Sequence, residues 1–290
     1  MDKRLTVPSV SIGMPVFNGE QFISHALDSL LEQSFSDFEL IISDNASIDG
    51  TESICREYAA RDARIRYVRQ PTPLGAWPNF KFVLSEARGK YFIWAACDDT
   101  RSPDFIELNF RFLSENPEYV ASTCPNSFEG QNSHAQSFVN FSLDGEVFER
   151  FIQFFNHCWL SHGIFYSLIR TDILRNCNVV GKTFLASDWA IDLYLASKGK
   201  INRTKDGYTI FGVQGASSAS DVFKTSRNDG IELLLPFYRL ARYVTNLTTS
   251  FPLGQRVRII LILLKLNLIA ALHPLHTVLY STLRALRRTR

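Results

Sequence analysis

The chain has 290 residues, of which 46% are hydrophobic and 21% charged, so it can bury a sizeable core and is not a disordered protein. A net charge of +2 argues against a dedicated nucleic-acid binder, and we expect no nucleic acid as a partner. The five cysteines include no Cys-x-x-Cys pair, and the N-terminus lacks the long apolar stretch of a signal peptide. These features predict a cytoplasmic protein whose thiols serve as small core residues.

Strand and helix signals alternate through the first 120 residues. Apolar runs predict strands at 10–14, 38–42, 65–68 and 91–96. Helical spacing or helix-boundary residues predict helices at about 22–31, 50–60, 75–87 and 102–116. Four strand–helix units predict an α/β fold with a mostly parallel, doubly wound sheet and helices on both faces.

The second half is patterned less clearly. Residues 125–150 are rich in Ser, Asn, Gln and Gly and predict a loop or meander, whereas 164–174 fit a strand followed by a helix. A helix is expected after Ser187, to about Ala196. The small residues of 212–220 predict a loop that can close over a site. We expect one domain up to about residue 220, followed by an appended segment.

Three predicted strands end in polar or turn-forming residues. These ends carry Pro15 to Asn18, Asp44 with Asn45, and Asp98 with Asp99. Ligands of doubly wound sheets bind beyond the carboxyl ends of the strands. The sequence therefore predicts that these residues converge on one site at one edge of the sheet.

Asp98 and Asp99 are adjacent carboxylates with no countercharge beside them in the sequence. A divalent cation relieves the repulsion of such a pair, and Mg²⁺ or Mn²⁺ binds through one or two carboxylates together with substrate phosphates. The alternative is a helix cap before Ser102 and Pro103, because Asp is a common N-cap residue. Asp44 at the neighbouring strand end favours the metal.

Two further acids have both a structural and a functional interpretation. Asp44 opens a loop in which Asp49 or Thr51 is expected to cap the next helix, while Asp44 itself points toward a ligand. Asp188 lies near the start of a predicted helix, where an acid stabilises the helix terminus. The alternative for Asp188 is a general base that removes a proton from an acceptor hydroxyl.

The ordered motifs resemble those of family 2 glycosyltransferases. They are SIGMPVFNGEQFISHALDSLLEQSFSDFELIISDNASIDGT, PLGAWPNF and ARGKYFIWAACDD. The resemblance is close over residues 8–120 and looser to about 220. It implies a GT-A fold whose catalytic domain spans 1–220, with a nucleotide-sugar-binding half at 8–120 and an acceptor-binding half at 121–220. It also implies an inverting transfer, from a UDP-sugar or a similar donor, to a hydroxyl of a saccharide or lipid-linked saccharide in bacterial cell-surface polysaccharide synthesis.

The resemblance also implies roles for individual residues. Asp98 and Asp99 fall at the family's metal and diphosphate site, which takes Mn²⁺ or Mg²⁺, and Asp188 falls at its catalytic base. Phe17 falls where the nucleoside base is stacked, and Asp44 where it is hydrogen-bonded. The full set expected to bind the nucleotide-sugar is Pro15, Phe17, Asn18, Asp44, Asn45, Gly75, Asn79 and Asp98.

The chain departs from the family at three positions. Ala96 stands where an acid often precedes the pair, Ser187 replaces a Glu beside the base, and Gln214 lies near the place of a metal-assisting His. These departures keep open a nucleotide-sugar-binding module without turnover. A nucleotidyltransferase is the other alternative, although the first strand is not followed by a Gly-rich basic loop.

Residues 221–290 are expected to form a helical, basic and amphipathic extension. From Arg256 to the end there are six Arg, one Lys and no acid, around an apolar stretch that ends at Leu272 and is interrupted by Lys265 and Asn267. The stretch is short for a membrane span of about 20 residues. It predicts a peripheral helix at the inner face of the plasma membrane, drawn to anionic lipid. The alternatives are packing on the catalytic domain or on a second copy in a homodimer.

Overall fold

The computed structural model of the chain describes residues 7–130, 141–159, 163–213 and 230–288, with side chains placed up to Leu272. The chain divides into two compact units, one of residues 1–182 with 191–219 and the other of residues 183–190 with 220–290. The expected division near residue 220 into a catalytic domain and an extension stays a prediction. The segment Thr183–Ala190 differs, because it clusters with the C-terminal residues rather than with the sheet.

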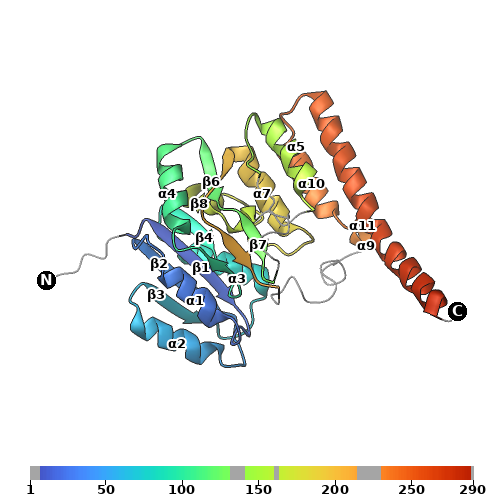
Figure 1. The fold of residues 1–290 in the computed structure, drawn as a ribbon. Coiled ribbons are helices and arrows are strands. Elements are labelled where there is room, and N and C mark those ends of the chain that lie inside the picture. The colour runs from blue at the N-terminus through green and yellow to red at the C-terminus, as the bar shows by residue number, and fades with distance from the viewer. Residues whose placement is uncertain (1–6, 131–140, 160–162, 214–229, 289–290) are drawn as a thin grey trace. The chain divides into compact units, whose positions relative to one another are not determined.

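A seven-stranded sheet organises the first unit (Figure 1). Its strand order is β3-β2-β1-β4-β8-β6-β9. The strands from β3 to β4 pair in parallel, β8 runs antiparallel to both of its neighbours, and β9 is parallel to β6. The strands are β1 (Val10–Val16), β2 (Phe38–Asp44), β3 (Ile65–Arg69), β4 (Tyr91–Trp94), β6 (Tyr119–Thr123), β8 (Leu168–Arg170) and β9 (Lys200–Arg203). The predicted mostly parallel sheet is confirmed.

Helices cover both faces of this sheet. The even-numbered apolar residues of β1 join the main core with the buried residues of α1 and α4, whereas Gly13 faces α3. A Cβ at Gly13 would lie 2.7 Å from both Val83 and Phe92, so only glycine allows α3 to pack this closely on β1. The helices of this unit are α1 (Ile23–Leu31), α2 (Thr51–Arg61), α3 (Ala76–Glu86), α4 (Phe105–Glu115), α5 (Val147–His157), η1 (Ile164–Tyr166) and α6 (Thr171–Arg175).

The end of β1 differs from the prediction that the strand breaks before Pro15. β1 continues to Val16, and Pro15 lies opposite Ser43 of β2. The pairing with β4 has already ended, because it runs only to Gly13 and Trp94, followed by the bond from Ala95 N–H to Gly13 O. Alternate residues of a strand direct their backbone polar groups to opposite sides, so the missing N–H of Pro15 is on the β4 side. It therefore breaks no ladder bond.

The segment predicted as a loop or meander contains regular structure in its described parts. β7 (Asn126–Phe128) forms a second, three-stranded sheet with β5 (Thr100–Arg101) and β10 (Thr209–Phe211). The Phe-rich residues Val147–His157 form α5, which begins with a capping box between Glu146 and Glu149. The prediction missed α5, because its many Phe residues have a low intrinsic helix preference, which the capping box and burial of the apolar face override.

The second unit is helical in its described part. It contains α9 (Gly230–Leu234), α10 (Tyr238–Leu247) and α11 (Leu253–Arg288), together with the first turn of α7 (Ser187–Lys198). Asn267 is buried and accepts a 2.9 Å hydrogen bond from the N–H of Phe237, the N-cap residue of α10. It is therefore a polar anchor inside the unit and not an interruption of an apolar surface. Among the helices that the structure describes, none is both long and apolar enough to cross a membrane.

Candidate nucleotide and metal site

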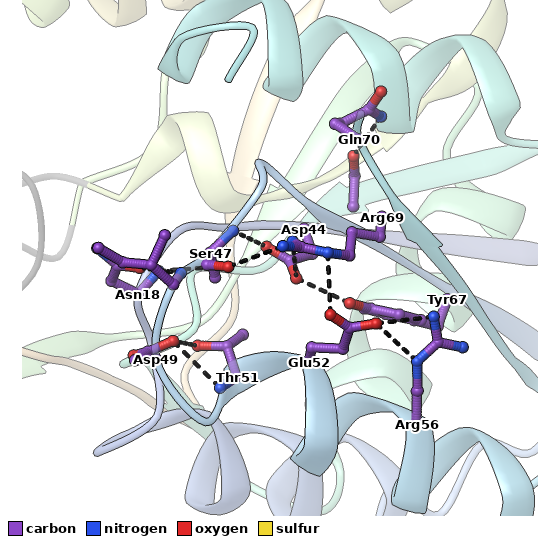
Figure 2. A network of polar contacts seen from close by, with 12 residues as sticks. Asn18, Asp44, Ser47, Asp49, Thr51, Glu52, Arg56, Tyr67, Arg69 and Gln70 are labelled. Carbon is purple, nitrogen blue, oxygen red and sulfur yellow. Dashed lines mark hydrogen bonds and ion pairs between the residues drawn. The ribbon is translucent and has the colours of Figure 1, made fainter. Parts of the chain in front are cut away.

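The loops after β1 and β2 are bound to each other by hydrogen bonds (Figure 2). The N–H of Asn18 donates to Ser47 Oγ at 2.9 Å, and the N–H of Ile48 donates to Asn18 Oδ1 at 3.0 Å. The N–H of Gly19 donates to Thr51 Oγ1 at 2.8 Å. Asn18 holds a positive φ of 53°, which Asn tolerates better than most residues. The structure thus brings two of the three predicted strand ends together.

Asp44 lies at the centre of this network, fully buried at the end of β2. Its Oδ1 accepts from the N–H of Ser47 at 2.8 Å, and its Oδ2 accepts from the Tyr67 hydroxyl at 2.7 Å. Arg69 lies 3.6 Å from the same Oδ2 and pairs with Glu52 at 2.9 Å. In this arrangement Asp44 holds the shape of the loop and places a carboxylate at its base. Direct contact of Asp44 with a nucleoside stays a prediction.

The other predicted nucleotide-binding residues lie around the same loop. Asn45 Oδ1 accepts from the N–H of Leu74 at 2.6 Å, which brings the turn at Gly75 (φ 90°) next to the β2 end. Phe17 is 51% exposed, so its ring is free of the core and available for stacking. Asn79 is buried and exchanges hydrogen bonds with Ser43, donating to its carbonyl and accepting from its hydroxyl. It therefore anchors α3 to β2, and its contact with a ligand stays a prediction.

Asp98 and Asp99 follow β4 beside the β1 loop. A Cβ on Gly19 would lie 3.2 Å from Cys97 Sγ, so the loop and the turn that carries Asp98 are in close contact. The helix-cap alternative for the pair is wrong, because β5 intervenes and α4 begins only at Phe105, with Asp104 as its N-cap residue. All three predicted strand ends therefore meet at the edge of the first unit's sheet.

Asp99 is a buried acid whose charge is only partly compensated. Its Oδ1 accepts from the N–H of Gly212 at 3.1 Å, and its Oδ2 has no hydrogen-bond partner among the residues that the structure describes. Burial raises the pKa of Asp99 from 3.8 to about 6; the cationic Arg101 opposes this rise, and Asp98 adds to it. The Arg101 guanidinium is itself buried, and within the described ranges it makes one hydrogen bond, from Nη2 to the carbonyl of Trp94.

The acid pair fits a divalent cation. The unpartnered Oδ2 of Asp99 is a buried anionic oxygen that a cation would satisfy, and Asp98 supplies a second carboxylate next to it. Within the described parts of the chain, no cluster of three or more His, Cys, Asp or Glu side chains is arranged to hold a metal ion. Mg²⁺ is commonly held by one or two carboxylates and completed by substrate phosphates.

Gly212 follows β10 and lies against Asp98. A Cβ at this position would come within 2.6 Å of both Cβ and Cγ of Asp98. We expect Gly212→Ala to displace the acid pair and to weaken Mn²⁺-dependent UDP binding roughly tenfold or more, since a displacement of about 1 Å can cost 100-fold in a positioned site. Calorimetry with UDP and Mn²⁺ measures this. Gly254→Ala is the matched control, because a Cβ there meets nothing within 4 Å; equal loss in both variants would contradict the prediction.

Asp188 belongs to the second unit and lies in the first turn of α7. Burial raises its pKa, while the N–H groups of Trp189 and of Asp188 itself lower it. Asp188 therefore does lie at a helix N-terminus, as the structural interpretation expects. Its raised pKa also suits a general base. Ser187, which stands in place of the family's Glu, bonds with the backbone of Phe184 instead. Gln214 lies outside the described residues.

Four residues near the site were not predicted as part of it: Tyr67, Arg69, Arg101 and Gly212. Tyr67 is the middle residue and Arg69 the last residue of β3, the strand next to β2. Their distance to Asp44 depends on the register between the two strands, which the sequence alone does not show. Arg101 follows the acid pair by two residues, a spacing that gives no signal of burial. Gly212 had a signal, because it opens the predicted small-residue loop.

The chain is similar in sequence to curated glycosyltransferases. The curated relatives include two proteins of Bacillus subtilis. EpsE, provisionally named a glycosyltransferase, is 34% identical over 39% of this chain and 41% of its own length. TuaG, a glycosyltransferase provisionally assigned to teichuronic acid biosynthesis, is 32% identical over 50% of this chain and 52% of its own length. The chain thus spans about half the length of these relatives.

Solved structures share the fold at low sequence identity. Staphylococcus aureus TarS 1-349 in complex with UDP-GlcNAc has a TM-score of 0.67 at 16% identity, covering 87% of this chain and 70% of TarS. The mannosyltransferase PcManGT of Pyrobaculum calidifontis, in complex with GDP-Man and Mn²⁺, has a TM-score of 0.51 at 17% identity, covering 96% and 80%. The fold is thus of the predicted GT-A type. Because the sequence pattern of Glycosyl transferase family 2 matches residues 11–174, the chain belongs to that family.

Proposed function

We propose that the chain transfers a sugar, with inversion, from a nucleotide-diphosphate donor to a hydroxyl of a saccharide or lipid-linked saccharide. Family membership supports the reaction class, and the UDP-GlcNAc complex of TarS supports UDP as the nucleotide. The single observation that carries the proposal is the buried Oδ2 of Asp99, which has no hydrogen-bond partner in the described part of the chain and lies beside Asp98, at the sheet edge where the β1 and β2 loops meet. This edge is where doubly wound sheets bind nucleotides.

Asp98 and Asp99 are proposed to hold Mn²⁺ or Mg²⁺. When bound, the metal offsets the charge that builds on the leaving diphosphate. The Mn²⁺ complex of the mannosyltransferase neighbour supports this assignment. Without the cation, the positive charge of Arg101 reduces the repulsion between the carboxylates of Asp98 and Asp99. Phe17 is proposed to stack on the nucleoside, which its exposed ring supports, and the loop held by Asp44 is proposed to shape the nucleoside subsite.

Asp188 is proposed to accept the proton of the attacking acceptor hydroxyl. Burial keeps its pKa raised, which makes the carboxylate a stronger base than an exposed Asp. The acceptor-binding role of residues 121–220 and the cytoplasmic location, at the inner face of the plasma membrane, belong to the same proposal. So does a role in cell-surface polysaccharide synthesis, which the assignment of TuaG supports.

A thermal-shift screen of nucleotide sugars, with and without Mn²⁺, tests the proposed donor. We expect UDP-sugars to raise Tm in the presence of Mn²⁺ and to lose most of this effect in EDTA, because ligands that bind only the folded state stabilise it. Nucleoside triphosphates are the control. A stronger effect of these triphosphates would favour a nucleotidyltransferase, and donor binding without turnover would favour an inactive binding module.

A further inference from the structure

Exposed apolar side chains of the second unit gather on two helices. On α9, Ile231, Leu233 and Leu234 are at least 51% exposed. α11 carries a longer row of exposed side chains: Leu253, Val257, Leu261, Leu264, Leu268 and Leu272. We call these two sets of residues the apolar surface. An exposed apolar area of this kind marks a binding site, because most soluble proteins keep their surface apolar residues scattered.

The helix α11 is apolar on two sides, which explains its composition. Ile259, Leu263, Leu266 and Ala270 are buried, and α11 packs against α10 within the same unit. The exposed row follows spacings of three and four residues along the opposite side, which is the spacing of a single helical stripe. Up to Leu272, where side chains are described, internal packing therefore uses one side of α11, and the other side is exposed to a partner.

The charge of the same segment selects the partner. From Arg256 to Arg290 the sequence has six Arg and one Lys but no acid, and Lys265 is exposed beside the stripe. Two copies that met through this segment would bring like charges together, which disfavours a homodimer contact. An anionic lipid surface complements both the basic charge and the apolar stripe.

The apolar surface is built into the unit that carries the proposed base. The rings of Trp189 and Phe237 are stacked, with their centroids 5.5 Å apart and an interplanar angle of 12°. The N–H of Phe237 is held by Asn267 of α11. Trp189, the neighbour of Asp188, is thus connected to α11 through the ring of Phe237 and the hydrogen bond from Phe237 to Asn267.

We propose that α9 and α11 form a docking surface for an anionic bilayer, and that this docking brings the segment carrying Asp188 to the membrane. The surface itself follows from exposure and charge, whereas the consequence for catalysis rests on the proposed function. The acceptor class that fits is a saccharide on a lipid carrier, because such a molecule presents its hydroxyls at the bilayer surface.

Co-sedimentation of the full chain with vesicles tests the surface. We expect binding to vesicles of equal parts phosphatidylglycerol and phosphatidylcholine, and much weaker binding to phosphatidylcholine alone. The double variant Leu264→Glu/Leu268→Glu is expected to reduce the partition onto anionic vesicles roughly tenfold or more, because it replaces two inserted leucines by carboxylates. Val7→Glu, at an exposed apolar residue of the first unit, is the matched control and leaves the partition unchanged.

Three results would overturn the proposal. They are no binding of the wild-type chain to anionic vesicles, equal binding of the double variant and the wild type, and a dimer in light scattering that the double variant dissociates. The last result would assign the surface to a second copy of the chain. The UDP and Mn²⁺ thermal shift is measured on the same samples, so a failure of the donor proposal is separated from a failure of the docking proposal.

Amide exchange tests the connection to Asp188. We expect anionic vesicles to slow exchange within residues 183–190 in the wild type and not in the double variant, because the ring stack and the Asn267 hydrogen bond tie this segment to α11. Unchanged exchange in a vesicle-bound wild-type chain would reject the connection while leaving the docking surface intact.

Discussion

Replacing Asp188 by Asn is expected to lower kcat for sugar transfer about 100- to 10,000-fold, the contribution of a positioned general base. The amide keeps the size of the side chain but cannot accept the proton of the attacking hydroxyl. Donor binding is expected to stay within about threefold, because Asp98 and Asp99, not Asp188, are proposed to bind the diphosphate. A transfer assay and calorimetry with UDP and Mn²⁺ measure the two effects separately.

Asp172→Asn is the matched control for this variant. Asp172 also lies in the first turn of a helix, α6, but is exposed, and its replacement should leave kcat unchanged. Burial raises the pKa of Asp188. As the pH is lowered, wild-type kcat should therefore begin to decrease at a higher pH than it would if the base were an exposed Asp. Full activity of Asp188→Asn would remove this residue from the mechanism.

Asp99→Asn is expected to stabilise the metal-free protein while abolishing Mn²⁺-dependent nucleotide binding. Burial raises the pKa of Asp99 to about 6 in the folded state, against 3.8 as its ordinary value. The folded state therefore holds this proton more tightly than the unfolded state, and ionisation above pH 6 costs stability. The gain in the variant should be on the order of 3 kcal/mol at pH 8. Asn retains the oxygen that accepts from Gly212.

The stability difference between Asp99→Asn and the wild type should depend on pH. The advantage of Asp99→Asn should be complete above about pH 6, decline between pH 6 and 4, and vanish below that, where the wild-type acid is protonated in both states. Urea unfolding in EDTA at several pH values measures it. The exposed Asp206→Asn is the control and should change little. Adding Mn²⁺ and UDP should make the wild type the more stable of the two proteins. An Asp99→Asn variant that is less stable than the wild type at pH 8 in EDTA would contradict this prediction.

The sequence predicted the first half of the fold because its signals are local. β1 to β4 are short apolar runs separated by helices, and the order of such units allows few arrangements. The same logic placed the loops after β1 and β2 and the acid pair at one sheet edge. The prediction failed at α5, where a capping box and burial outweigh the low helix preference of its Phe residues.

The sequence by itself determined the family, the parallel sheet and the convergence of Asn18, Asp44 and Asp98, because strand ends and motifs are written in consecutive residues. Only the tertiary structure decided which side-chain oxygens already accept a hydrogen bond. In the part of the chain that the structure describes, Asp44 is bonded to Tyr67, one oxygen of Asp99 has no hydrogen-bond partner, and Asn267 is an internal anchor. Such facts depend on burial and on strand or helix register between segments far apart in the chain, and no local pattern encodes them.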